Sequence, residues 1–148
     1  MVRVSETIQV NEPVEVVYAY LDRPENHAEI SPSLVESEMI EQLENGGKRA
    51  SYTYRMAGVS REGELTETVH EDGERMVFEM SGELTGTIDI AVAAVDGGTE
   101  VTYAAEYELP GRVLSAVAEP LAKRYNRREL ATTLQNLKSR LETEAARE

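Results

Sequence analysis

The sequence predicts an α+β fold in which a curved, seven-stranded antiparallel sheet wraps around a long C-terminal helix, and three observations predict it. Apolar and polar residues alternate in seven short segments. Short turn sequences separate the last six, so consecutive strands pair antiparallel, because a parallel crossover needs about a dozen residues or more. The segment from Arg112 to about Thr143 has helical composition and periodicity. At this length we expect residues 1–148 to form a single domain.

The N-terminal part is predicted to form one strand and two short helices. Residues 2–10 alternate between apolar and mainly polar positions, which is typical of a half-buried strand. Asn11 can cap a helix that has Pro13 in its first turn, and apolar residues recur at the helical period over 14–21. A second short helix is expected over 24–30, because the next proline disfavours helical geometry just beyond it.

The middle of the chain is predicted to form a meander of six strands. Turn sequences such as Asn45-Gly46-Gly47 and Asp96-Gly97-Gly98 separate the alternating segments. Each connection is short, so each strand is expected beside the next one in the chain. The predicted strands cover residues 34–41, 48–57, 59–71, 75–81, 84–95 and 99–109.

The C-terminal helix carries one apolar stripe, in which leucines from Leu130 to Leu141 fall at three- and four-residue spacings. Pro120 removes a backbone hydrogen bond and clashes with the preceding turn. We therefore expect a kink or a break between residues 116 and 120. On this interpretation the main helix begins at Pro120, and residues 112–119 form a separate lid.

The chain is strongly acidic, with 28 aspartates and glutamates against 15 lysines and arginines and a net charge of -13. Such a surface repels a phosphate backbone, which excludes nucleic acid as a partner. Only Lys48, Lys123 and Lys138 are lysines. This acidic, lysine-poor composition is similar to that of proteins from salt-loving organisms, so we expect a halophilic protein; an ordinary acidic protein of a mesophile is the alternative.

Several kinds of site are excluded. The chain has no cysteine and only two histidines, so we expect neither a disulfide, a metal site nor a cofactor. No apolar run approaches the ~20 residues that span a bilayer, and the N-terminus lacks the pattern of a signal peptide. A cytoplasmic protein without a membrane span is therefore expected. Neither a nucleophilic triad nor a glycine-rich phosphate loop is recognisable.

Three segments carry a resemblance to a known family: residues 8–18, where a strand leads into a proline-initiated helix, Tyr107 to Gly111, and Leu134 to Glu142. Over nearly the whole chain, the order of elements resembles the START-like superfamily of polyketide cyclase/dehydrase and lipid-transport proteins. The resemblance implies the helix-grip fold. The chain departs from many relatives at the end of the second short helix, where it has His27-Ala28-Glu29-Ile30 in place of a tryptophan.

A sheet curled around a helix tends to leave a concave, mostly apolar space that can hold a ligand. The alternation selects the strand residues that face it, and Val117 and Leu121 are selected from the helix. The alternative interpretation is that these side chains simply fill the core. The selected strand residues are Tyr52, Tyr54, Met56, Leu65, Phe78, Met80, Ile88, Ile90, Tyr103 and Tyr107.

Two charged residues of the predicted fourth strand, Arg61 and Glu67, share the face of its apolar residues. Buried charges need partners, so they either pair with each other or meet a polar group of a ligand. Alternatively, a slipped register or a bulge near Gly63 turns Arg61 outward. His27 either gates the cavity entrance or is a solvated surface residue, and His70 is expected at the surface.

Three functions are consistent with these features. The leading hypothesis is a binding module that holds a lipid, an isoprenoid or a polycyclic compound between sheet and helix. The second, implied by the resemblance, is an enzyme similar to the aromatase/cyclases that works without metal or cofactor, with Tyr54, Arg61, Glu67 and Tyr103 moving protons. The third is an interaction protein that uses its acidic surface or the basic cluster of residues 123–128. A protein partner or a homodimer is left open.

Overall fold

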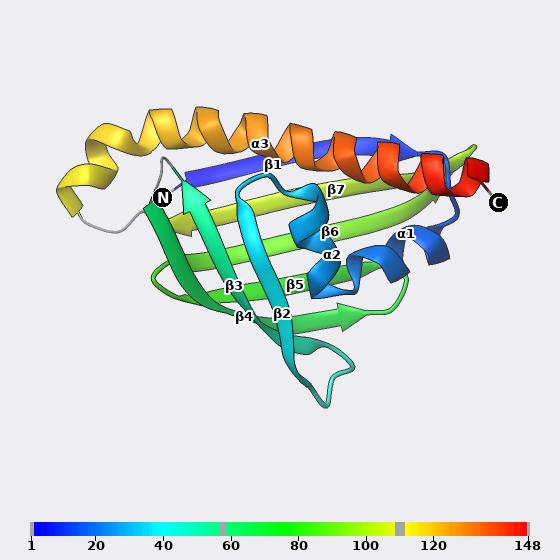
Figure 1. Ribbon diagram of the computed structural model, residues 1–148, viewed down its shortest axis with the longest axis horizontal. Coiled ribbons are helices and arrows are strands. Elements are labelled where there is room, and N and C mark those ends of the chain that lie inside the picture. The colour runs from blue at the N-terminus through cyan, green and yellow to red at the C-terminus, as the bar shows by residue number, and fades with distance from the viewer. Residues whose placement is uncertain (1, 57–58, 109–111, 148) are drawn as a thin grey trace.

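The computed structural model describes the backbone of residues 2–56, 59–108 and 112–147, with side chains except at 56, 59, 112–119 and 144–147. Strands and helices follow one another in the predicted order (Figure 1). In chain order these are β1 (Val2–Val10), α1 (Val14–Leu21), α2 (Pro24–Ile30), β2 (Leu34–Gln42), β3 (Lys48–Met56), β4 (Val59–Glu71), β5 (Arg75–Gly82), β6 (Thr85–Val95), β7 (Gly98–Glu108) and α3 (Arg112–Arg147).

The strands form one antiparallel sheet in the order β1-β7-β6-β5-β4-β3-β2. Each strand from β2 to β6 lies beside the next strand in the chain, and β1 pairs with β7 at one edge of the sheet. The sheet curves, and α3 runs along its concave side (Figure 1). The predicted α+β architecture, with seven strands and two short helices after the first, is confirmed.

Glycines make the tight hairpins possible. Gly46 and Gly97 have φ of 88° and 85°, a left-handed conformation that side chains with a Cβ rarely adopt. They lie in the turns β2–β3 and β6–β7, where the sequence predicted turns. The register of these hairpins follows from their turns, and register shifts interrupt the pairing of β2 with β3 and of β4 with β5.

Two clusters of buried apolar side chains form the core. The larger packs Leu134, Leu137 and Leu141 of α3 against the sheet and α1. The smaller joins Val2 and Val4 of β1 to the earlier part of α3. Both anchor the same helix, so α3 is fixed to the sheet on either side of the space described below.

The structure corrects two predictions about the helices. The helix α3 continues through Pro120, so the break, the start of the main helix at Pro120 and the separate lid are wrong, whereas the expected kink corresponds to an inclination of the first turns of α3 to the rest (Figure 1). A helix can bend around a proline and keep its other hydrogen bonds. The N-cap of α1 is Pro13, and no side chain caps it. The backbone N–H of Asn11 instead donates to Glu142 at 2.9 Å, which ties the end of β1 to α3.

None of the helices within the described ranges has an apolar stretch sufficient to cross a membrane.

Candidate functional site

A cavity lies between the curved sheet and α3. Its volume is ≈ 140 Å³, about ten times the space that one water molecule requires. The strands supply walls that are largely apolar, and α3 supplies Asn126, Glu129, Leu130 and Thr133. Concave, mostly apolar spaces with a few polar groups are the usual sites of small-molecule binding. The cavity is therefore the candidate site.

The structure brings together most of the side chains that the sequence selected. The regular pairing of β5, β6 and β7 keeps their inward residues in register, for example Ile88 opposite Ala105. Nine of the fourteen selected residues line the cavity, while their contact with a ligand stays a prediction. They are Tyr52, Tyr54, Leu65, Phe78, Met80, Ile88, Ile90, Tyr103 and Tyr107.

Of the two residues selected from the helix, Leu121 does not contribute to this wall. Leu121 is 70% exposed and points away from the cavity, because Ala122, one position further along the helix, takes the inward place. The selection of Leu121 was therefore wrong. The side chains of Val117 and of Met56 lie outside the described residues.

Arg61 and Glu67 also lie off the cavity wall. The pairing of β3 with β4 is regular around Gly63 and sets Arg61 opposite Tyr54, so the bulge expected there as an alternative is absent from this pair of strands. Arg61 is half-buried. Glu67 is fully buried, but it pairs with Lys48, and the two predicted partners do not meet.

A hydrogen-bonded network joins the sheet to α3 at one side of the cavity. The carboxylate of Glu129 accepts a bond from the Tyr54 hydroxyl at 2.6 Å and one from the backbone N–H of Ser33 at 2.7 Å. The Tyr54 oxygen also lies 3.1 Å from Oδ1 of Asn126, whose amide donates to the hydroxyl of Tyr107. A ligand would therefore meet polar groups that are already held in place.

Four of the seven tyrosines line the cavity: Tyr52, Tyr54, Tyr103 and Tyr107. Burial is the main cause that raises the pKa of each. For Tyr103, burial and the charge of Glu129 raise the pKa to about 12. All four phenols are therefore protonated at neutral pH. Tyr54 already donates its proton to Glu129, whereas Tyr52 has a hydroxyl proton to donate to a ligand.

The Tyr52 hydroxyl has no partner. Among the described residues, it is the one buried side-chain nitrogen or oxygen without a hydrogen bond. Gly63 lies opposite Tyr52 on β4 and makes room for the phenol, since a Cβ on Gly63 would come within 2.7 Å of the hydroxyl oxygen. Buried polar groups are normally paired, so this hydroxyl is a candidate contact for a polar atom of a ligand.

The substitution Tyr52→Phe is expected to leave the free energy of unfolding of the ligand-free protein unchanged or raise it by up to about 2 kcal/mol, because burying an unpaired hydroxyl costs about 1–3 kcal/mol. Urea denaturation measures the change. Tyr54→Phe is the matched control: it removes a hydroxyl that Glu129 binds and should destabilise by about 1–3 kcal/mol. Equal destabilisation by both substitutions would show that Tyr52 is paired.

A second polar region surrounds Lys48. Its Nζ lies 2.6 Å from Oδ1 of Asp22 and 2.8 Å from Oε1 of Glu67. The side chains of Lys48 and Glu67 are 6% and 0% exposed, and Lys48 lines the cavity beside the ring of Phe78. An ammonium group has three donors. The two carboxylates occupy two of them, which leaves one for an acceptor in the cavity.

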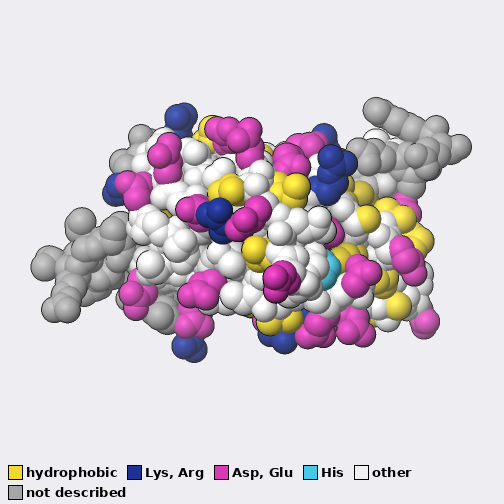
Figure 2. Space-filling view, turned by 90° about the horizontal axis from the view of Figure 1, so that it is seen from below, with side chains coloured by type: hydrophobic (Ala, Val, Ile, Leu, Met, Phe, Trp, Pro, Cys, Tyr) yellow, Lys and Arg dark blue, Asp and Glu magenta, His cyan; other side chains and the backbone are white. Residues whose placement is uncertain are grey.

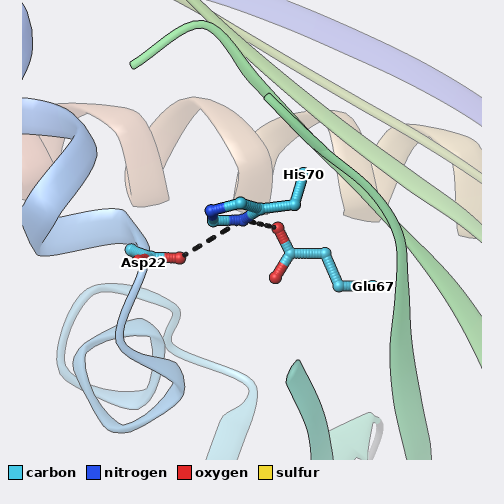
Figure 3. A group of neighbouring side chains, drawn as sticks. All are labelled: Asp22, Glu67 and His70. Atoms are coloured by element: carbon cyan, nitrogen blue, oxygen red, sulfur yellow. Dashed lines mark hydrogen bonds and ion pairs between the residues drawn. The ribbon is translucent and has the colours of Figure 1, made fainter. Parts of the chain in front are cut away.

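His70 joins this cluster because of a β-bulge (Figure 3). Its Nδ1 lies 2.7 Å from Oε2 of Glu67 and 3.9 Å from Oδ1 of Asp22. The pairing of β4 with β5 shifts register between Glu67 and Val69, so positions 67 and 70, which regular alternation would put on opposite faces, share one face. The side chain of His70 is 12% exposed, and the prediction of a surface position was wrong.

The cluster has the donor set of a cation site. Asp22, Glu67 and His70 offer ligand atoms that all lie within 4.8 Å of one another. The ammonium group of Lys48 already contacts both carboxylates, so the chain itself supplies the positive charge, and a divalent ion would have to displace it. We therefore interpret the cluster as an ion-pair network at one end of the cavity.

His27 lines the cavity. Its Nε2 donates to the carbonyl of Leu21 at 2.6 Å, which fixes the ring. Burial lowers the pKa of His27, although the bond to Leu21 opposes the shift. The interpretation as a solvated surface residue does not hold, and a gating role stays a prediction.

Several polar residues of the site were not selected from the sequence, among them Lys48, Asn126 and Glu129. A signal for each was present. Lys48 lies four residues before Tyr52 on the same face of β3, and Asn126 and Glu129 share the inward face of α3 with Leu130. These three side chains are strongly polar, which argued against placing them in a mostly apolar cavity. Their hydrogen-bond and ion-pair partners are visible only in the structure.

A family model described as polyketide cyclase / dehydrase and lipid transport matches residues 1–142. The chain belongs to this family. The cavity-lining residues discussed above fall within the matched range, so the site is part of the family's domain. Among curated proteins, none matches the chain significantly.

Solved structures share the helix-grip fold of this family member at low sequence identity. The protein TTHA0849 from Thermus thermophilus has a TM-score of 0.85 and 17% identity, covering 95% of this chain and 97% of that one. A START superfamily protein from Mycobacterium smegmatis has a TM-score of 0.77 and 14% identity over 95% and 97%. The Zhui aromatase/cyclase from Streptomyces sp. R1128 has 0.76 and 13% over 95% and 93%. These likenesses establish the fold alone.

Proposed function

We propose that this family member binds a small, largely apolar molecule in the cavity between the sheet and α3. The observation that carries the proposal is the unpaired Tyr52 hydroxyl, which belongs to a wall that is otherwise mostly apolar. A polar atom of the ligand would satisfy this hydroxyl, and the apolar part of the ligand would cover side chains such as Phe78 and Ile90.

The polar groups narrow the class of ligand. Tyr52 and the free donor of Lys48 favour an acceptor oxygen, such as a carbonyl, on one part of the ligand. Glu129 favours a donor, such as a hydroxyl, on another part. The volume favours a compact molecule, for example one or two rings or a short isoprenoid, over a whole phospholipid. Among the lipids, isoprenoids and polycyclic compounds expected from the sequence, we therefore favour small molecules that carry both a hydroxyl group and a ketone.

Apolar burial makes useful affinity attainable. Covering ~300 Å² of apolar ligand surface contributes about 7 kcal/mol at about 25 cal/mol per Å². The loss of translational and rotational freedom is subtracted from this, and hydrogen bonds to placed donors add selectivity. We expect dissociation constants of about micromolar order.

The substitution Ala105→Phe is expected to weaken ligand binding at least about tenfold, because Ala105 lines the cavity and a larger side chain would fill it. Native mass spectrometry identifies a bound molecule, and calorimetric titration measures its affinity. Ala93→Phe is the control, since Ala93 is exposed on the same sheet, and it should bind normally. The proposal fails if no compound of a hydroxy-ketone library binds, or if Ala105→Phe binds as tightly as the parent chain.

A second candidate is proton-transfer catalysis on such a ligand. The contact of the Tyr54 hydroxyl with the Glu129 carboxylate at 2.6 Å favours it, because a carboxylate beside a phenol can accept and return a proton. The Zhui protein of similar fold is an aromatase/cyclase. Of the residues named for this role from the sequence, Tyr54 and Tyr103 line the cavity, whereas Arg61 and Glu67 do not.

The amino-acid composition adds the cellular setting to this proposal. We propose that residues 1–148 act as one domain in the cytoplasm of a salt-adapted organism. Acidic side chains are spread over the face shown in Figure 2, with cations scattered singly among them. Such a high net charge keeps a protein soluble, and salt that screens its self-repulsion stabilises the compact fold.

A further inference from the structure

One stretch of α3 differs in charge from the rest of the surface. Lys123, Arg124, Arg127 and Arg128 are all exposed, and none of the four forms an ion pair with a side chain that the structure describes. Cations elsewhere in the described chain are mostly paired with carboxylates. The paired ones are Arg3, Lys48, Arg49, Arg75, Lys138 and Arg140.

Apolar side chains accompany these cations. Leu121 is 70% exposed and Tyr125 is 42% exposed. With 3.6 residues per turn, Leu121, Arg124 and Arg128 share the outward face of α3, opposite the buried Ala122 and Leu130. We call Leu121, Lys123, Arg124, Tyr125, Arg127 and Arg128 the α3 patch.

We propose that the α3 patch docks on an anionic lipid surface. Interfacial helices combine cations with large apolar residues on the side that meets the membrane, and aromatic residues such as tyrosine favour the headgroup level. Three of the four cations are arginines, whose planar guanidinium groups bind phosphate in bidentate fashion. An exposed leucine between them favours a lipid surface over an acidic protein, which would offer charge without an apolar layer.

The charge of the remaining molecule fixes the orientation of docking. The net charge of -13 repels an anionic surface, and the α3 patch, where four unpaired cations cluster, opposes this repulsion locally. The α3 patch is therefore the face that can approach, and its apolar side chain Leu121 is 70% exposed there.

Docking through this face also places the cavity next to the surface. Asn126, Glu129 and Leu130, on the inward side of the same turns, line the cavity. Tyr125 connects the α3 patch to the segment before β2 through its hydroxyl, 2.7 Å from Oγ of Ser33. The inference goes beyond the proposed ligand binding and does not depend on it, because surface docking needs no occupant in the cavity.

The test is cosedimentation with vesicles, in the lowest KCl concentration at which circular dichroism shows the protein to be folded. The protein should bind vesicles of equal parts phosphatidylglycerol and phosphatidylcholine and should not bind pure phosphatidylcholine. Each cation near an anionic surface contributes about fivefold in affinity. The double variant Arg124→Glu/Arg128→Glu should therefore lose at least about tenfold, and Leu121→Ser about threefold or more.

The control is Arg23→Glu/Arg55→Glu, which changes the net charge by the same amount at two other exposed positions. It should keep binding within about threefold. Three results would overturn the proposal: no sedimentation of the parent chain with anionic vesicles, equal loss in the control, or undiminished binding by the Arg124/Arg128 variant. Capture by immobilised poly-glutamate without vesicle binding would assign the α3 patch to an acidic protein partner instead. Ligand titrations in the absence of vesicles test the cavity separately.

Discussion

Replacing Lys48 by methionine is expected to lower the free energy of unfolding by about 3–5 kcal/mol, because the change leaves a buried carboxylate without its partner. The side chain of Glu67 is 0% exposed and its Oε1 lies 2.8 Å from Nζ of Lys48. Methionine has a similar length and fills the same space, so the loss of stability is attributable to the missing positive charge. Asp22 is 37% exposed and can be hydrated instead.

Urea denaturation of Lys48→Met measures this effect, with Lys123→Met as the control. Lys123 is exposed on α3 and should change stability by less than about 0.5 kcal/mol. The double variant Lys48→Met/Glu67→Leu removes both charges and should recover at least half of the loss, because apolar replacements of buried pairs are often neutral. A loss below about 1 kcal/mol in Lys48→Met would mean that water reaches Glu67.

Leu137→Ala is expected to destabilise the protein by about 2–5 kcal/mol, through lost burial and the cavity it leaves. Leu137 is 0% exposed and lies in the larger core cluster with Leu134 and Leu141. This cluster holds the C-terminal half of α3 on the sheet, so the side chains around the substitution have little freedom to close the gap.

The control for Leu137→Ala is Leu121→Ala in the same helix. Leu121 is 70% exposed, and its truncation should change stability by less than about 0.5 kcal/mol. Thermal and urea denaturation compare the two leucines directly. Similar losses would mean that Leu121 packs against another part of the molecule.

The sequence predicted the fold closely because its signals are local. The alternation of apolar and polar residues predicted every strand, and the glycines between strands predicted the hairpin turns. Short turns then dictated the antiparallel order, since they permit no other pairing. Nine side chains of the cavity wall followed from alternation alone, because strands that keep register carry inward residues in fixed columns.

The parts that escaped prediction depend on contacts between distant segments. The bulge between Glu67 and Val69 adds one residue to β4 and brings His70 inside. The alternation of apolar and polar residues in this strand does not predict the bulge. Lys48 was not selected because its partners, Asp22 after α1 and Glu67 on β4, lie far from it in the sequence. Pro120 was expected to kink or break the C-terminal helix, which continues through it.

The tyrosine-rich wall gives the protein a built-in optical reporter. The chain has no tryptophan, so its near-ultraviolet absorption and emission come almost entirely from seven phenol rings, and four of these line the cavity. A molecule that enters will alter the surroundings of more than half of the chromophores at once. Occupancy can therefore be followed by intrinsic fluorescence, without a label and without changing a residue.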